Sequence, residues 1–233
     1  MDPSSHGFVY LAADVAAPSR PGPVLSSRRR RIVVEQAKRL VSEANDLPEV
    51  VDARVFTARG FAPAQRVTRP DGRAVPDARF DLAILIETTS PQAAQATMRS
   101  DPVATLANLL RVGGRRTAAF AARNVRRIAD VDASRDGLFL FNHFVADEVE
   151  PALPVWEQMA AWYAAETGLD NSMLLQPLEG EASDYVFVNH ARWDMSLPRF
   201  VFTQFSKPSF RTEVLAKLRE HGMVSMPVLY GLA

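Results

Sequence analysis

Hydrophobic positions along the chain follow two different periods, and the order of these patterns occurs twice. Short apolar runs typical of strands alternate with stretches in which apolar residues recur about every 3.6 positions, as in amphipathic helices. The first half is predicted to contain strands at 8–15, 50–58, 80–88 and 116–125, and helices at 27–45 and 91–112. The second half is predicted to contain strands at 137–145, 173–178, 185–193 and 223–230, and helices at 150–167 and 197–220. Each half therefore has the order βαββαβ.

A serine–proline motif supports this internal repeat. Serine as N-cap followed closely by proline marks the start of a helix. The motif occurs twice in each half with the same ten-residue separation, at Ser90, Ser100, Ser196 and Ser206. Because proline breaks a continuous helix, each region is expected to form two helical pieces, with corners at Pro102 and Pro208.

Two such units, residues 1–130 and 137–233 joined by 131–136, predict an α+β fold of two ferredoxin-like βαββαβ repeats. The predicted strands are apolar at nearly every position, so both faces of each sheet must be covered. Helices cover one face, and the simplest cover for the other is the sheet of the other half. We therefore expect antiparallel sheets packed face to face as an intramolecular α/β barrel, in a monomeric pseudo-dimer or a homodimer.

Composition narrows the class of protein. The 233 residues include no cysteine, which excludes disulfide scaffolds, thiolate metal sites and cysteine nucleophiles and suits a reducing compartment. No apolar run has the roughly 20 residues that a membrane helix needs. The first residues lack the basic region of a secretory signal. We expect a cytoplasmic protein that acts on a small molecule and has no membrane partner.

The net charge of zero conceals a division between the halves. Residues 1–130 carry 20 basic and 13 acidic side chains, whereas residues 131–233 carry 7 and 14. Such asymmetry fits a nucleic-acid surface or an attraction between the two halves. We favour the second interpretation and predict no nucleic-acid partner, because the dense basic run at 28–31 has no interleaved aromatic residues.

Candidate chemistry is concentrated in the second half, where one dipeptide occurs twice. Asn142 and His143 lie on its first predicted strand, and Asn189 and His190 lie on its third. In this topology we expect the two strands to be central, adjacent and parallel. Because side chains alternate along a strand, each asparagine and its histidine point to opposite faces, and a matched register would place both histidines on one face. A slip of one residue would instead pair an asparagine with a histidine.

Both residue types can carry out chemistry or belong to the core. A histidine can act as a general base near neutral pH, and an asparagine amide can hold a carbonyl or a developing oxyanion. Buried histidines and amides can equally be bonded to backbone or water as parts of the structure. We predict His143 and His190 as catalytic residues and Asn142 and Asn189 as substrate-binding residues, with the structural interpretation left open.

Two further residues complete the predicted pocket. Trp162 lies on the predicted helix 150–167 and could form an aromatic wall, although aromatic residues at helical spacing usually pack in a core. Arg192 could clamp a carboxylate or enolate. Alternatively, Arg192 could form an ion pair at the barrel rim, and its candidate partners are Glu181, Asp184 and Asp194.

The first half is expected to be the poorer host for a pocket. At the 106-residue offset of the serine motif, Asn189 and His190 correspond to Ala83 and Ile84, which are apolar. Several chemistries are absent from the whole sequence: it has no glycine-rich phosphate loop, no G-x-S-x-G elbow and no recognisable metal-ligand spacing.

Two segments carry a family resemblance. The segment FNHFVADEVEPALPVWEQMAAWYAAETGLDNSMLLQPLEG and the following DYVFVNHARWD resemble members of the dimeric α/β barrel superfamily related to antibiotic-biosynthesis monooxygenases. The resemblance covers residues from about 137 to 233, and in the first half it is one of topology alone. It implies a pocket between a sheet and its helices. The superfamily includes cofactor-independent monooxygenases, polyketide cyclases, isomerases and haem proteins such as chlorite dismutases, so the fold does not choose among activities.

The resemblance and the candidate residues together predict an enzyme of secondary metabolism. We expect cofactor-independent oxygenation, cyclisation or isomerisation of a hydrophobic or aromatic small molecule. The alternatives are a haem-dependent enzyme, with His143 or His190 as the axial ligand, and a non-catalytic binding protein of the same fold.

Overall fold

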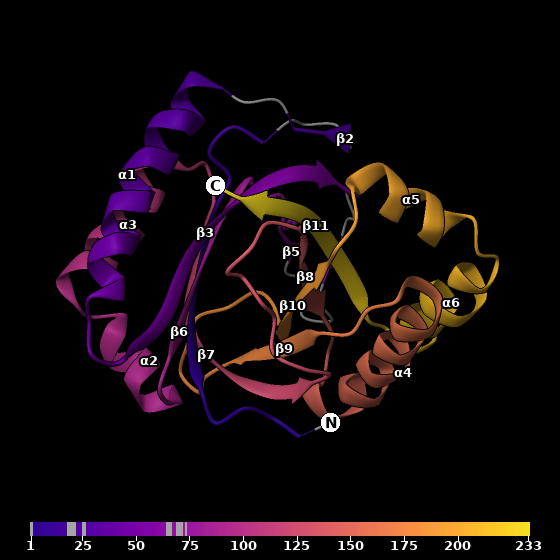
Figure 1. Ribbon diagram of the computed structural model, residues 1–233. Coiled ribbons are helices and arrows are strands. Elements are labelled where there is room, and N and C mark those ends of the chain that lie inside the picture. The colour runs from indigo at the N-terminus through magenta and orange to yellow at the C-terminus, as the bar shows by residue number, and fades with distance from the viewer. Residues whose placement is uncertain (1, 18–21, 25–26, 64–66, 69–71, 73) are drawn as a thin grey trace.

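A closed barrel of eight antiparallel strands forms the centre of the molecule (Figure 1). The strands follow the order β11-β8-β10-β9-β7-β1-β6-β3, and pairing of β3 with β11 closes the ring. Their bounds are β1 (Gly7–Ala13), β3 (Val50–Phe61), β6 (Leu82–Thr88), β7 (Thr117–Arg127), β8 (Leu138–Val145), β9 (Ser172–Pro177), β10 (Phe187–Trp193) and β11 (Val224–Leu232). This computed structural model describes residues 2–17, 22–24, 27–63, 67–68, 72 and 74–233.

The barrel consists of two four-stranded units with the same topology. In each unit the strands lie in the order fourth, first, third, second, which is β7-β1-β6-β3 in the first half and β11-β8-β10-β9 in the second. This is the ferredoxin-like arrangement, and the α+β fold of two such units closed into a barrel is the predicted fold.

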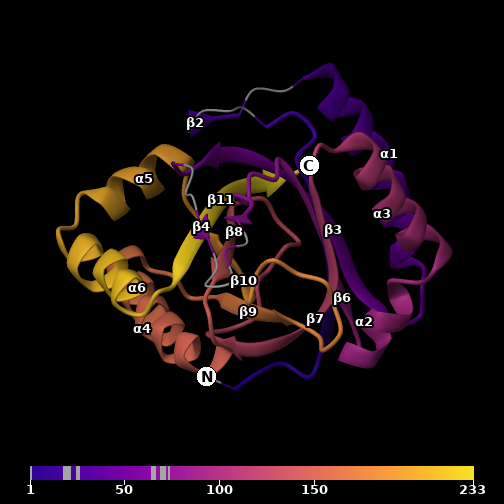
Figure 2. The ribbon, with the colours of Figure 1, turned by 180° about the vertical axis from the view of Figure 1, so that it is seen from behind.

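Helices cover the barrel on two opposite sides (Figures 1 and 2). One layer contains the helices of the first half: α1 (Arg28–Asn45), α2 (Pro91–Thr97) and α3 (Asp101–Gly113). The other contains those of the second half: α4 (Val149–Thr167), α5 (Leu197–Phe205), the π-helix η1 (Phe210–Leu215) and α6 (Ala216–Glu220). Among the described residues, no helix combines the length and the apolar character needed to cross a membrane.

Local signals in the sequence explain where these helices begin and end. The Ser27 hydroxyl accepts a hydrogen bond from the Arg30 amide and caps α1, and the Ser90 hydroxyl caps α2 in the same way through Ala93. Gly168 adopts a φ of 69° and ends α4, a conformation that costs glycine little. Both predicted corners are present, because Pro102 lies in the first turn of α3 and Pro208 lies between α5 and η1.

The structure also contains elements that the sequence pattern did not predict. Three two-residue strands, β2 (Gly22–Pro23), β4 (Val67–Thr68) and β5 (Ala74–Val75), lie outside the eight-stranded ring. The π-helix η1 replaces the regular α-helix expected after Pro208. A π turn often occurs at a functional site, and η1 lies in the helical layer of the second half.

The prediction that β8 and β10 run parallel is wrong, because these neighbours are antiparallel. The hairpin-like connection from β9 to β10 reverses the chain, so the first and third strands of each unit run in opposite directions. The register still places Asn142 directly opposite Asn189, and it places His190 opposite Phe141. Directly opposed residues share a face, so the two asparagines lie on one side of the sheet and the two histidines on the other.

Candidate functional site

The two predicted histidines lie inside the barrel, within its aromatic core. His143 contacts the rings of Tyr185 and Phe80, with centroids 4.8 and 5.5 Å away. Its Nδ1 lies 3.4 Å from the backbone oxygen of Met226, and its Nε2 lies 2.8 Å from the Tyr10 hydroxyl. Burial raises the pKa of Tyr10 well above its usual value, so the hydroxyl stays protonated and donates to Nε2. The His143 imidazole therefore has a partner on each nitrogen.

His190 is held in a similar way on the neighbouring strand. Its ring stacks on Phe141 with a centroid distance of 4.3 Å, and its Nδ1 lies 3.3 Å from the backbone oxygen of Leu140. Burial lowers the pKa of His190 to about 3 and that of His143 to about 4. Both rings are therefore neutral at pH 7 and enclosed by aromatic side chains. Their surroundings favour a structural role, and their catalytic role stays a prediction.

The two asparagines face the opposite way, toward the helices of the second half. The Asn189 amide oxygen accepts hydrogen bonds from Trp156 Nε1 at 3.0 Å and from the Ser172 hydroxyl at 2.7 Å. Asn142 is directly opposite, yet its amide oxygen is buried and has no hydrogen-bond partner. A buried acceptor without a partner costs about 1–3 kcal/mol, and such groups are rare in native structures. The orphaned oxygen of Asn142 is therefore the group in this layer that most needs a ligand.

The asparagine pair keeps a little exposed surface, and we call this slight opening the crevice. Asn142 is 7% exposed and Asn189 is 6% exposed, although both lie in the middle of a sheet face that helices cover. Leu11 and Ile84 form the corresponding helix-facing pair in the first half, and both are 0% exposed. The centre of the second layer thus keeps a small exposed surface, whereas the centre of the first is fully enclosed.

The elements that cover the crevice are irregular. Pro154 lies inside α4 and removes one helical hydrogen bond, and the π turn of η1 carries Phe210. Phe210 packs against Trp162, which in turn donates from Nε1 to the Ser209 hydroxyl at 3.1 Å. Trp162 therefore lies in the helical layer of the asparagines, as part of its aromatic core.

Arg192 lies at the barrel rim, on the face of β10 that also carries His190. Its guanidinium pairs with Asp194 at 2.5 Å and donates to the backbone oxygen of Asp136 at 2.9 Å. Asp194 is thus the partner among the three acidic candidates. The six predicted site residues form two groups on opposite sides of the sheet, with His143, His190 and Arg192 on the inner face and Asn142, Asn189 and Trp162 in the helical layer.

Two clefts of ligand size lie in the first half, which the sequence predicts to be the poorer host for a pocket. A cleft of about 900 Å³ lies between α1 and β3, and a smaller one of about 470 Å³ lies between α1 and α3. Arg30 and Arg31 of the basic run at 28–31 line the larger cleft, but the sequence did not predict a cleft there, because its other wall comes from distant segments. Ser172 was also missed, and the only available signal was its helix-facing register at the start of β9.

Neither a metal nor a haem finds a suitable set of ligands. Among the described residues, no group of three or more histidine, aspartate or glutamate side chains could hold a metal ion. A haem iron needs an accessible imidazole nitrogen, whereas His143 has a partner on each nitrogen and His190 is stacked among phenylalanines. The residues named for the haem alternative therefore do not fit that group.

Comparison with solved structures shows the fold. An anthrone oxidase-like protein matches with a TM-score of 0.64 and 13% identity, over 99% of this chain and 92% of its own. A protein from Fusobacterium nucleatum with a provisional description as a monooxygenase matches with a TM-score of 0.55 and 7% identity, over 97% and 91% of the two chains. A similarly described protein from Lactobacillus acidophilus gives 0.50 and 9%, over 97% and 94%. No protein-family model and no curated protein matches the sequence.

Proposed function

Because the chain has the dimeric α/β barrel fold, we propose that it is an enzyme whose small-molecule substrate enters the crevice at Asn142. The orphaned amide oxygen of Asn142 is the observation that carries this proposal. An amide oxygen accepts hydrogen bonds, so the group that satisfies it must be a donor such as a phenolic or enolic hydroxyl. The Asn142 amide nitrogen can at the same time donate to a carbonyl on the same ligand.

The surroundings of Asn142 favour an apolar, planar substrate. Its layer contains the large side chains of Trp156, Phe144 and Phe187, which belong to one buried cluster. Aromatic walls with a few polar groups are typical of small-molecule sites. A hydroxylated aromatic compound therefore matches the crevice in both polarity and shape.

The reaction we propose is cofactor-independent oxygenation of such a compound in secondary metabolism, with cyclisation or isomerisation as alternatives. The polar groups around Asn142 and Asn189 are amides and hydroxyls, so they bind and orient a hydroxylated substrate rather than remove its proton. Similarity to structures described as anthrone oxidase-like and as monooxygenases supports an oxygenase-type reaction.

The test measures O2 consumption with anthrone as the probe, together with quenching of tryptophan fluorescence by the same compound. We expect the wild-type chain to show both, and Asn142→Leu to lose most of both because its hydrogen-bonding amide is gone. Asn108→Leu is the matched control, since Asn108 is exposed on α3 far from the crevice, and it should behave as wild type. Full turnover in Asn142→Leu, or no quenching in the wild type, would overturn the proposal.

Two further readouts separate the alternatives. His190→Phe should retain turnover, since Phe can replace the stacked ring, whereas a catalytic His190 would lose roughly 10²–10⁴-fold. A Soret band in the visible spectrum of the purified protein would favour the haem-dependent alternative. Quenching without turnover would favour a binding protein.

A further inference from the structure

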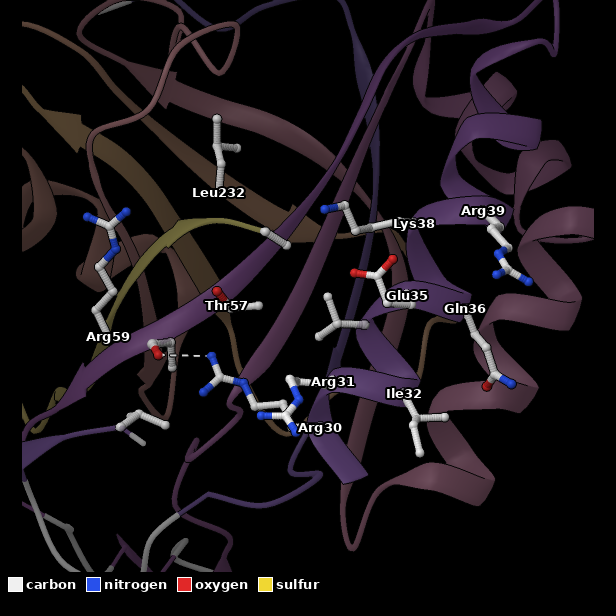
Figure 3. Close-up of a pocket in the computed structure, with 14 residues that line it drawn as sticks. Arg30, Arg31, Ile32, Glu35, Gln36, Lys38, Arg39, Thr57, Arg59 and Leu232 are labelled. Atoms are coloured by element: carbon white, nitrogen blue, oxygen red, sulfur yellow. Dashed lines mark hydrogen bonds between the residues drawn. The ribbon is translucent and has the colours of Figure 1, made fainter. Parts of the chain in front are cut away.

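The cleft of about 900 Å³ in the first half is a separate feature from the crevice at Asn142 (Figure 3). One wall is α1, and the other is formed by β3 together with the end of β11. Its floor includes apolar groups from Val34, Ala58 and Leu232. The cleft therefore combines an apolar base with walls from two different elements.

The walls of this cleft are strongly basic. Five lining residues carry positive charge: Arg30, Arg31, Lys38, Arg39 and Arg59. Glu35 is the one acidic side chain among the lining residues. Two of the five positive side chains already pair with carboxylates outside the lining, Arg30 with Asp81 and Arg59 with Asp136.

Two of the basic residues are fixed by contacts within the fold. Arg30 is buried and donates from Nη2 to the backbone oxygen of Ala58 at 3.0 Å. Arg59 lies at a bulge between β3 and β11 and pairs with Asp136 at 2.8 Å. The Arg59 guanidinium passes close over Gly231, and a Cβ there would require this flexible side chain to shift.

The other basic residues have no partner. Within the described part of the chain, Arg31, Lys38 and Arg39 make no hydrogen bond or ion pair through their side chains. Some arginines elsewhere pair with carboxylates, as in Arg115–Asp14 and Arg126–Glu157. In Figure 3, Lys38 extends from α1 toward Leu232, whereas Arg39 points to the outer side of the helix. Arg31 and Lys38 are therefore the free cations nearest the cleft.

The sequence of α1 also opposes the helix dipole. Its first turn consists of arginines and contains no acidic residue. Positive side chains at a helix N-terminus are unfavourable, because the macrodipole already places partial positive charge there. An unfavourable local arrangement, such as positive charge in the first turn of a helix, is expected at functional positions. A bound anion would offset this positive charge.

We propose that this cleft binds a small organic polyanion with at least two phosphate or carboxylate groups. Arg31 and Lys38 are seven residues apart on one helix, which corresponds to roughly 10 Å along its axis. A ligand with anionic groups separated by a similar distance could contact both, while its apolar part rests on Val34 and Leu232. The cleft volume is within the range of small-molecule sites, roughly 300–1,000 Å³.

The test is calorimetric titration of the full chain at low salt with inorganic tripolyphosphate, and separately with ATP as an organic polyanion. We expect both to bind, with ATP tighter because its organic part reaches the apolar floor. The double variant Arg31→Gln/Lys38→Gln should weaken binding by at least about tenfold, since two charge-assisted contacts are lost. The control Arg99→Gln/Arg219→Gln removes the same charge from exposed residues of α2–α3 and α6 and should change Kd by less than about twofold.

Thermal unfolding of each variant shows whether it is folded, so loss of binding cannot be mistaken for loss of structure. Equal weakening by the control would mean general attraction to a basic half and would overturn the proposal. Unchanged binding in Arg31→Gln/Lys38→Gln would do the same. A duplex oligonucleotide that binds more tightly than ATP and depends on the same two residues would identify a nucleic-acid surface instead.

Discussion

The two helical layers cover the same kind of sheet with different chemistry. In the first half, the helix-facing residues are small and aliphatic, and the pair Leu11 and Ile84 at the centre is fully enclosed. In the second half, the same position in the topology carries Asn142 and Asn189, surrounded by tryptophans and phenylalanines. Closure of the barrel therefore does not require the polar pair, since the first half closes with an aliphatic pair at the same position.

The free-energy cost of burying the asparagine pair comes mainly from one atom, the amide oxygen of Asn142. Asn189 is satisfied by Trp156 and Ser172, so its burial is compensated. Asn142 leaves its oxygen without a partner, next to a crevice that the first layer lacks. The first half shows that an aliphatic pair fits this position, so the unsatisfied amide of Asn142 lowers the stability of the second half. Such a loss of stability is expected at functional sites.

The two layers should differ most in how much unfolding free energy they lose when a buried leucine is truncated to alanine. Leu11 and Leu140 are both helix-facing on the first strand of their halves, but Leu11 is fully enclosed whereas Leu140 is 6% exposed. Leu11→Ala should cost about 4 kcal/mol and Leu140→Ala about 2 kcal/mol, because Leu140 is less completely enclosed. Urea unfolding at pH 7 measures both, and equal losses would show that the second layer is packed as tightly as the first.

The inner faces of the two halves differ as well, because both barrel histidines come from the second half. Their pKa values of about 4 and about 3 lie below the value of about 6.5 in an unfolded chain. Below pH 6.5 the unfolded state therefore binds more protons, and stability falls as the pH falls. Between pH 7 and pH 4.5 we expect each histidine to contribute a loss of roughly 2 kcal/mol.

His190→Phe should remove one of these two contributions while preserving the stack on Phe141. The measurement is the urea midpoint at several pH values for the wild type and the variant. A variant with the same acid sensitivity as the wild type would mean that carboxylates, and not the buried imidazole, govern this pH range.

Asn142→Leu tests the central difference directly. Replacing the unsatisfied amide by an aliphatic side chain of similar volume should stabilise the protein by about 1–2 kcal/mol, since the variant resembles the Leu11–Ile84 layer. Asn189→Leu should instead destabilise, because Trp156 and Ser172 would lose their acceptor. Thermal unfolding compares the two variants, and destabilisation by both would show that the Asn142 oxygen has a partner in solution.

Much of the barrel could be predicted from the sequence, because period and breaking residues determine where strands and helices fall. The face of each residue was harder to predict. Ala83 was matched to Asn189 by the 106-residue offset, but Ala83 faces the barrel interior and Asn189 faces the helices. The two units correspond in these strands at an offset of 105 and not 106, as the facing pairs Leu11–Ile84 and Asn142–Asn189 show, and a shift of one residue reverses the face of a side chain.

The site could be predicted only in part, for a related reason. The sequence placed Asn142 and Asn189 on neighbouring strands, and a matched register was enough to bring them together. Which face of the sheet would lie inside the barrel depends on how the two halves close, and no local pattern contains that information. The rim pair of Arg192 with Asp194 and the basic cleft beside α1 likewise depend on contacts between distant segments.

The smallest expected effect concerns the outer surfaces of the two helical layers. Val201, Phe202 and Phe205 are all exposed on α5, whereas the exposed large apolar residues described in the first half lie on three separate elements. Phe202 is 75% exposed and Val112 of α3 is 68% exposed, so Phe202→Ser and Val112→Ser should each change the free energy of unfolding by less than about 0.5 kcal/mol. Grouped apolar residues bind hydrophobic probes better than isolated ones. Only Phe202→Ser should therefore lower the fluorescence of added anilinonaphthalene sulfonate, and an equal decrease in both variants would mean that the two surfaces do not differ in this respect.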